Sequence, residues 1–253
     1  ALPISTQRQP KNDAVGKIIH LMEALVRSER VTSVRDLAAA AGVPRSTAHR
    51  FLAALESYGW AVQDAESGAY RAGLRFFLLN HRPVLFEALV RSAKEPMRRL
   101  VGRTGKTAIL SVIEGMGGLC VHTEEPEIAV KFVAREGMSV PLCAGATGLV
   151  LLAFCEPSLR ERILASPLKM PDGSEADAPR LRERVAEIRR VGCAHSREEW
   201  MANAEDLSVP LYDRRGHFVA QLGIAGVAGT FGNWEAELLP ALKSAAAEIA
   251  SSM

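Results

Sequence analysis

The sequence predicts an α+β protein with two domains, a small helical domain at the front and a larger domain built on an antiparallel sheet. Two observations support this prediction. Residues 14–57 hold three short helical patterns in a row, followed by a strand–turn–strand pattern over 60–72. From residue 104 onward strand patterns predominate, interrupted and closed by helical ones. The length of 253 residues fits one large domain or two ordinary ones.

The composition is that of an ordinary globular protein, with 48% hydrophobic and 24% charged residues. No run approaches the roughly 18 apolar residues that a membrane-spanning helix needs, and residues 1–17 lack the apolar core of a secretory signal. We therefore expect a cytoplasmic protein with no membrane partner, beginning with a mobile polar arm over residues 1–13. The four cysteines are scattered without metal-site spacing, so we expect buried thiols, no metal site and no cofactor.

The front domain, expected over residues 14–80, contains three short helices and a hairpin. Ser33 is suited to the N-cap of the second helix, with Asp36 three residues later. Apolar stripes at helical spacing and alternation around a polar turn predict the helices at 14–28, 33–41 and 44–57, and the hairpin at 62–72.

The third helix concentrates hydrogen-bond donors near its N-terminus. These donors are Arg45, Ser46, Thr47, His49 and Arg50. A short helix, a tight turn, a second helix with exposed donors and a hairpin form the winged helix-turn-helix arrangement, whose recognition helix enters the DNA major groove by its N-terminal residues. The alternative is a solvated helix face, on which arginine and serine are common. The whole arrangement favours DNA binding over that alternative.

The charge distribution is uneven, but only mildly. The formal net charge is +2, with ten basic and seven acidic residues in 1–80 and a slight acidic excess in the remainder. This asymmetry permits a nucleic-acid partner for the front domain without establishing one.

Residues 81–103 carry an amphipathic helical pattern and are expected to form a linker helix. Its apolar side either contributes to a contact between subunits or packs against the second domain, and the sequence leaves both open. The second domain, expected over 104–253, mixes strand and helix patterns. Strands are expected at 107–115, 118–125, 128–136, 207–213 and 217–227, with a closing helix at 235–251.

The entry to an apolar helix near residue 145 is rich in small residues, with the sequence AGATG over 144–148. Small side chains at a helix N-terminus let a ligand approach the backbone N–H groups closely. The positive end of the helix dipole favours an anion there. This stretch is therefore a candidate site for a small molecule.

Three motifs carry a specific resemblance. They are VRDLAAAAGVPRSTAHRFLAALESYGW, VPLCAGATGLVLLAF and LSVPLYDRRGHFVAQLGIAG. Over nearly all of its length the chain resembles the IclR family of transcriptional regulators, and within that family the regulators of aromatic-acid catabolism. The resemblance implies a GAF-like effector domain behind the winged helix-turn-helix domain, and assembly into a homodimer or tetramer. It also implies binding to a double-stranded DNA operator and control by a small organic acid effector.

The resemblance further implies which residues contact the effector. By motif position they are Ala146, Thr147, Ser196, Asp206, Leu207, Gly223 and Ala225. Members that bind small oxo-acids carry cysteine where this chain has Asp206, and serines where it has Gly223 and Ala225. We therefore expect a larger pocket with fewer hydroxyls. Such a pocket favours a (hydroxy)aromatic carboxylate as effector, with an aliphatic oxo-acid such as glyoxylate or pyruvate as the alternative.

Asp206 is expected at the end of this pocket away from the effector's carboxylate, which the amides of 144–148 would bind. At that far end it could accept a charge-assisted hydrogen bond from a phenol. The alternative is a structural role, as the cap of a loop or the partner of an arginine such as Arg135.

An enzyme acting on a small acid is the remaining alternative. The sequence has six histidines, but no H-E-x-x-H pairing and no G-x-S-x-G turn. Cys193 and His195 lie two residues apart, which is a weak signal for nucleophilic chemistry. We therefore expect no catalytic residues.

Overall fold

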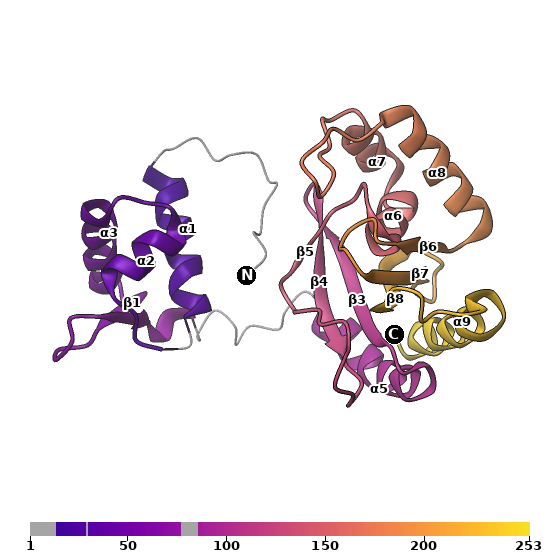
Figure 1. Cartoon of the computed structure of the whole chain (residues 1–253), viewed down its shortest axis with the longest axis horizontal. Coiled ribbons are helices and arrows are strands. Elements are labelled where there is room, and N and C mark those ends of the chain that lie inside the picture. The colour runs from indigo at the N-terminus through magenta and orange to yellow at the C-terminus, as the bar shows by residue number, and fades with distance from the viewer. Residues whose placement is uncertain (1–13, 29, 77–85) are drawn as a thin grey trace. The chain divides into compact units, whose positions relative to one another are not determined.

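The computed structural model describes residues 14–28, 30–76 and 86–253 (Figure 1). The arm predicted for residues 1–13 and the start of the predicted linker at 81–85 lie outside the described residues. The described parts form two compact units, one before and one after residues 77–85, and each is described by itself.

The first unit is the predicted three-helix domain with a hairpin. Ser33 caps the second helix, because its side chain accepts a hydrogen bond from the Asp36 amide. The core holds Leu21, Leu37 and Tyr70, each at most 2% exposed. The elements are α1 (Ala14–Arg27), α2 (Val34–Ala41), α3 (Arg45–Ser57), β1 (Ala61–Gln63) and β2 (Tyr70–Ala72).

The hairpin of β1 and β2 is closed by a polar turn. Asp64 Oδ1 accepts hydrogen bonds from the amide of Ser67 at 2.9 Å and from its hydroxyl at 2.6 Å. Gly68 follows with a positive φ of 66°, a conformation that costs glycine little. The turn therefore has the side-chain chemistry that a tight reversal needs.

The second unit is built on a six-stranded sheet in the order β5-β4-β3-β8-β7-β6. All neighbouring strands in it are antiparallel. The strands are β3 (Thr107–Glu114), β4 (Gly117–Glu124), β5 (Ser139–Val140), β6 (Ala194–Arg197), β7 (Ala204–Tyr212) and β8 (Phe218–Val227). The predicted fold class, helix-turn-helix unit plus antiparallel-sheet unit, is confirmed.

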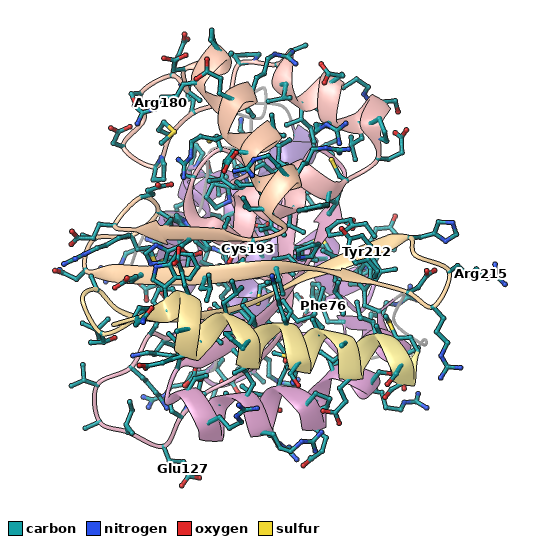
Figure 2. All side chains as sticks on the ribbon, turned by 90° about the vertical axis from the view of Figure 1, so that its right-hand side faces the viewer. Phe76, Glu127, Arg180, Cys193, Tyr212 and Arg215 are labelled. Atoms are coloured by element: carbon teal, nitrogen blue, oxygen red, sulfur yellow. The ribbon has the colours of Figure 1, made fainter. Side chains whose placement is uncertain are left out.

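Helices cover both faces of this sheet (Figure 2). One apolar core lies between the sheet and the pair α5 (Glu87–Thr104) and α9 (Trp234–Ser252). A second core lies around the helices of the other face. These are α6 (Gly145–Phe154), α7 (Pro157–Leu164) and α8 (Ala178–Val191). No helix among the described residues combines the length and apolar character needed to cross a bilayer.

The strand predicted at 128–136 is wrong, because this segment is irregular. Ile128, Val130 and Val133 are 51%, 73% and 53% exposed instead of alternating between core and solvent. Residues later in the chain occupy the outer edge of β4. The Cys120 amide donates to Met138 O at 2.9 Å, and the Gly137 amide donates to Cys120 O at 2.8 Å. The edge strand is therefore β5, and the apolar alternation at 128–136 finds no partner strand.

Helix α5 covers most of the predicted linker helix, and its apolar side is buried. Leu89, Ala93, Met97 and Leu100 lie in the core that α5 shares with α9 and the sheet. Of the two roles left open for this helix, the structure shows packing against the second unit. The same apolar side is then not available as a contact between subunits.

Candidate functional site

Helix α3 presents its predicted donors to solvent. Arg45, Ser46, His49 and Arg50 are exposed and Thr47 is half-buried, whereas the opposite side of the helix lies in the core. The fold produces this separation because apolar residues recur at helical spacing along α3. Within the described part of the chain, the two arginines have no acidic partner. The N-terminal half of α3 is therefore a face of uncompensated cations and hydroxyls.

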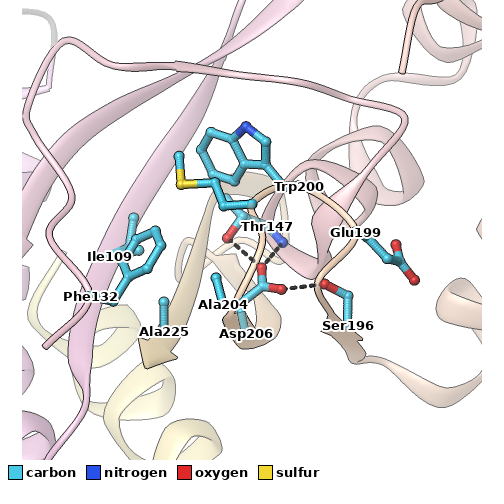
Figure 3. Close-up of a pocket in the computed structure, with 10 residues that line it drawn as sticks. Ile109, Phe132, Thr147, Ser196, Glu199, Trp200, Ala204, Asp206 and Ala225 are labelled. Atoms are coloured by element: carbon cyan, nitrogen blue, oxygen red, sulfur yellow. Dashed lines mark hydrogen bonds between the residues drawn. The ribbon is translucent and has the colours of Figure 1, made fainter. Parts of the chain in front are cut away.

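The second unit contains a small cavity on the α6 side of the sheet, with a volume of about 20 Å³ (Figure 3). Strands β3, β6, β7 and β8, the first turn of α6 and the loop at 198–203 contribute its walls. The polar lining residues are Thr147, Ser196, Glu199 and Asp206. The apolar lining residues are Ile109, Phe132, Trp200, Met201, Ala204 and Ala225.

Asp206 lies at the floor of this cavity and accepts three hydrogen bonds. The Thr147 amide donates to its Oδ2 at 3.0 Å and the Thr147 hydroxyl at 3.3 Å, while the Ser196 hydroxyl donates to Oδ1. Burial raises the pKa of Asp206 above its usual value, although the hydrogen bonds from Ser196 and Thr147 act in the opposite direction. No arginine, lysine or histidine among the described residues pairs with this carboxyl.

The first three amides of α6 all donate to protein side chains. The Gly145 amide donates to Glu199 Oε2 at 3.4 Å, and the Ala146 amide donates to Ser196 Oγ at 3.2 Å. The Thr147 amide donates to Asp206, as described above. We expected these amides to be free for the carboxylate of an effector, and that expectation is wrong in this structure. Asp206 stands at the helix end, not at the opposite end of the pocket, and it does not pair with Arg135.

Glu199 is held by α8 as well as by α6. The Arg184 guanidinium donates to both of its carboxylate oxygens, at 2.8 and 3.0 Å. The loop that carries Glu199 begins and ends at residues with positive φ, Glu198 at 59° and Asn203 at 60°. Such angles are uncommon for residues other than glycine and cost glutamate more than asparagine, so Glu198 is the more strained of the two ends of the loop.

A chain of buried hydrogen bonds holds Thr147 in place beneath Asp206. Gln221 Nε2 donates to Ser208 Oγ at 2.8 Å, and the hydroxyls of Ser208 and Thr147 lie 3.3 Å apart. Ser208 and Gln221 are fully buried. The polar corner of the cavity therefore continues into the core, and the Thr147 side chain is fixed from both sides.

The predicted effector contacts divide between the cavity and other places. Thr147, Ser196, Asp206 and Ala225 line the cavity, and Ala146 lies beside it with its amide on Ser196. Leu207 does not line it. Because successive side chains on a strand point to opposite faces, Leu207 lies in the core shared with α5 and α9.

The expected enlargement of the pocket at Gly223 is not found. A Cβ at Gly223 would lie 2.3 Å from Gln221 Nε2 and 2.5 Å from Ser208 Oγ. The space that a larger side chain would need is therefore filled by two neighbouring polar side chains. Gly223 serves their packing and does not widen the cavity.

Several lining residues were missed by sequence reasoning. Ile109 could have been found, because it pairs in register with Gly223 on the neighbouring strand. Phe132 comes from the segment that was wrongly predicted as a strand. Glu199, Trp200 and Met201 come from an irregular loop that carries no periodic signal.

Comparison with known proteins gives matches to both units. Residues 86–251 match the family described as "Bacterial transcriptional regulator IclR C-terminal", and residues 14–65 match the IclR helix-turn-helix domain. The HTH-type transcriptional regulator KdgR of Escherichia coli (strain K12) is 28% identical over 225 residues, covering 86% of this chain and 84% of KdgR.

Two solved structures extend these matches. An IclR homolog from Microbacterium hydrocarbonoxydans, crystallised in complex with 4-hydroxybenzoate, is 25% identical with a TM-score of 0.75, covering 95% of this chain and 98% of the other. Pseudomonas aeruginosa HmgR is 30% identical with a TM-score of 0.53, covering 93% and 96%.

The exposed donors of α3, the hairpin beside it and the matches to both units define a DNA-binding transcriptional regulator, not an enzyme. The chain belongs to the IclR family.

Proposed function

We propose that a small hydroxylated aromatic acid binds in the cavity of the second unit and changes the affinity of this regulator for its operator. The observation that carries this proposal is the lining of the cavity. Phe132, Trp200 and Ile109 supply apolar walls suited to a ring, and a single polar corner is formed by Asp206 and its donors. An apolar cleft with a few convergent polar groups is the usual form of a small-molecule site.

The bound complex of the Microbacterium homolog supports the choice of ligand. That protein was crystallised with 4-hydroxybenzoate, and this chain shares its fold over 95% of its length. The occupied amides of α6 weigh against a ligand held mainly by its carboxylate, such as glyoxylate or pyruvate, whereas an aromatic acid also has a ring for the apolar walls and a hydroxyl for Asp206.

Binding of an aromatic ring requires the cavity walls to move. A free volume of about 20 Å³ holds about one water molecule. The loop at 198–203 is the suitable moving part, because it carries Trp200 and Met201 and is bounded by the positive-φ residues Glu198 and Asn203. Displacement of this loop would also pull on Glu199 and its partner Arg184 in α8. Ligand entry is thereby coupled to the surrounding helices.

The hydroxyl of the ligand is placed at Asp206. The test is calorimetry on the wild type and on Asp206→Asn, with 4-hydroxybenzoate and with benzoate. We expect the wild type to prefer the hydroxylated acid by about tenfold or more, as a charge-assisted hydrogen bond provides, and the variant to lose most of that preference. Equal binding of the two acids by both proteins would assign Asp206 a purely structural role. Binding of pyruvate or glyoxylate without binding of either ring compound would contradict the aromatic proposal.

Operator binding is measured in the same series. A gel shift with an operator fragment, with and without 4-hydroxybenzoate, should show a change in affinity in the wild type. Ligand binding without any change in operator affinity would separate the pocket from regulation and contradict the proposal.

A further inference from the structure

We propose that the cavity recognises its effector by a hydrogen-bond donor and not by negative charge, so that neutral phenols bind at least as tightly as the corresponding phenolic acid. This inference rests on the proposed function, because it takes the cavity to be the effector site. It assigns a wider ligand class to that site, namely uncharged aromatic alcohols.

The charges of the lining side chains disfavour an anionic ligand. Among the described residues that line the cavity, none is arginine, lysine or histidine, and the two ionisable ones are Glu199 and Asp206. Arg184 compensates Glu199 through two hydrogen bonds to its carboxylate. Asp206 has only uncharged donors around it. A carboxylate entering this space would find no cation and one uncompensated carboxyl.

The N-terminus of α6 is already occupied by an acidic side chain of the protein itself. The N-terminus of a helix ordinarily offers amides and a positive dipole end to an anion. Here the carboxyl of Asp206 already occupies this position, since Thr147 donates to it from both its amide and its hydroxyl. The chain therefore supplies its own anion at the place where a ligand's anion would be stabilised.

The side chains at the floor of the cavity can accept a further hydrogen bond but have no free hydroxyl hydrogen to donate. The Ser196 and Thr147 hydroxyls both donate to Asp206, so neither hydrogen is free for a ligand in this arrangement. Asp206 Oδ1 accepts a hydrogen bond from Ser196, and a carboxylate oxygen accepts about two hydrogen bonds. In Figure 3 the indole nitrogen of Trp200 points away from Asp206. The unused capacity at the floor is therefore that of an acceptor, which matches a ligand hydroxyl.

The experiment compares four ligands of one ring on the wild-type full chain by calorimetry. They are 4-hydroxybenzoate, its neutral isostere 4-hydroxybenzamide, 4-methylphenol and benzoate. We expect the two neutral phenols to bind at least as tightly as 4-hydroxybenzoate, and benzoate to bind at least about tenfold more weakly than all three. Tighter binding of 4-hydroxybenzoate than of both neutral phenols by tenfold would overturn the inference while leaving the proposed function intact. Binding of none of the four would overturn the proposed function, and the inference with it.

Asp206→Asn with Asp213→Asn as its matched control supplies a second test. The asparagine keeps the shape of the side chain and removes its charge. The ratio of the affinity for 4-hydroxybenzoate to the affinity for 4-methylphenol should therefore be about tenfold higher in the variant than in the wild type. Asp213→Asn makes the same chemical change at an aspartate between β7 and β8 that does not line the cavity, and should leave the ratio of the two affinities unchanged. An unchanged ratio of the two affinities in Asp206→Asn would contradict the inference.

Discussion

The Cα of Gly148 lies directly against the carbonyl oxygen of Pro141. A Cβ added to Gly148 would sit only 1.7 Å from that oxygen, and 2.8 Å from the carbonyl carbon. Helix α6 therefore packs backbone against backbone on the segment that precedes it. This approach is open only to glycine, and it belongs to the same helical turn that places Thr147 on Asp206.

Gly148→Ala should destabilise the second unit strongly. The clash is with backbone, which cannot turn aside as a flexible side chain can, so we expect a loss of about 3 kcal/mol or more in the free energy of unfolding. Gly102→Ala is the matched control, because a Cβ at this position in α5 meets nothing within 4 Å. There the gain in helix propensity should stabilise by up to about 1 kcal/mol. Urea unfolding followed by circular dichroism compares the two, and equal stability of both variants would contradict the packing described.

The raised pKa of Asp206 predicts a specific dependence of stability on pH. An unfolded aspartate titrates near a pH of about 3.9. The folded state holds the proton of the Asp206 carboxyl to a higher pH than the unfolded state does. The wild type should therefore lose stability relative to Asp206→Asn as pH rises from about 3.9 to the raised pKa. Above the raised pKa the difference should be constant. Urea unfolding of both proteins between pH 4 and pH 7.5 measures it.

Asp213 provides the control of opposite sign. Hydrogen bonds donated by the amides of His217 and Arg215 lower the pKa of Asp213. The stability of the wild type relative to Asp213→Asn should therefore fall as pH drops below about 3.9 toward the lowered pKa, so this pair is measured from pH 7.5 to below that value. A difference between wild type and Asp206→Asn that rose with pH, as the Asp213 pair should, would contradict the burial of Asp206.

The four cysteines should be unreactive in the folded protein. All four are buried as free thiols, and burial raises the pKa of Cys120 to about 12. Since the thiolate is the reacting form, labelling with a disulfide reagent at neutral pH should be slower than in the unfolded chain by roughly 100-fold. Absorbance of the released thiolate follows the reaction. One thiol reacting at the unfolded rate would show that part of the second unit opens readily.

The long amphipathic elements could be predicted from the sequence because their periodicity reports a local pattern of burial. The helices α3 and α9 and the strands β3 and β8 were found in this way. The segment 128–136 carries an equally good alternation, yet it is irregular because Gly137, Met138 and β5 occupy the edge of β4. Competition for a sheet edge depends on residues elsewhere in the chain, and no local pattern reports it.

The arrangement of the candidate site also depends on contacts that no local sequence pattern reports. Thr147 and Asp206 were both selected, but as opposite ends of a pocket. Their contact joins residues 59 positions apart, and it reverses the role of the aspartate from a distant acceptor to the partner of the helix amides. Trp200 and Glu199 were missed because a loop held by two positive-φ residues has no sequence period. Residue identity suggested the chemistry, and only the fold gave its arrangement.

The regulator should assemble at least into a homodimer. A single winged helix makes few contacts with DNA, and two copies on a symmetric operator multiply the affinity. The apolar side of α5 is buried within the second unit, so the contact between subunits must use other surface. Sedimentation at micromolar concentration should show a dimer or tetramer. A monomer that binds the operator normally would contradict this prediction.

Arg45 and Arg50 should contribute directly to operator binding. Both are exposed at the N-terminal half of α3, and neither is paired with an acid among the described residues, so each is available to a base or a phosphate. Arg45→Ala and Arg50→Ala should each weaken operator binding by about 1–3 kcal/mol if the side chain reaches a base. A phosphate contact would instead weaken binding equally on all sequences and make the salt dependence shallower.

Arg27→Ala is the matched control, because Arg27 lies on α1 and is paired with Glu23 at 3.2 Å. Fluorescence anisotropy with operator and scrambled DNA at several salt concentrations separates the two kinds of contact. Undiminished operator affinity in the Arg45→Ala, Arg50→Ala double variant would remove α3 from the DNA interface.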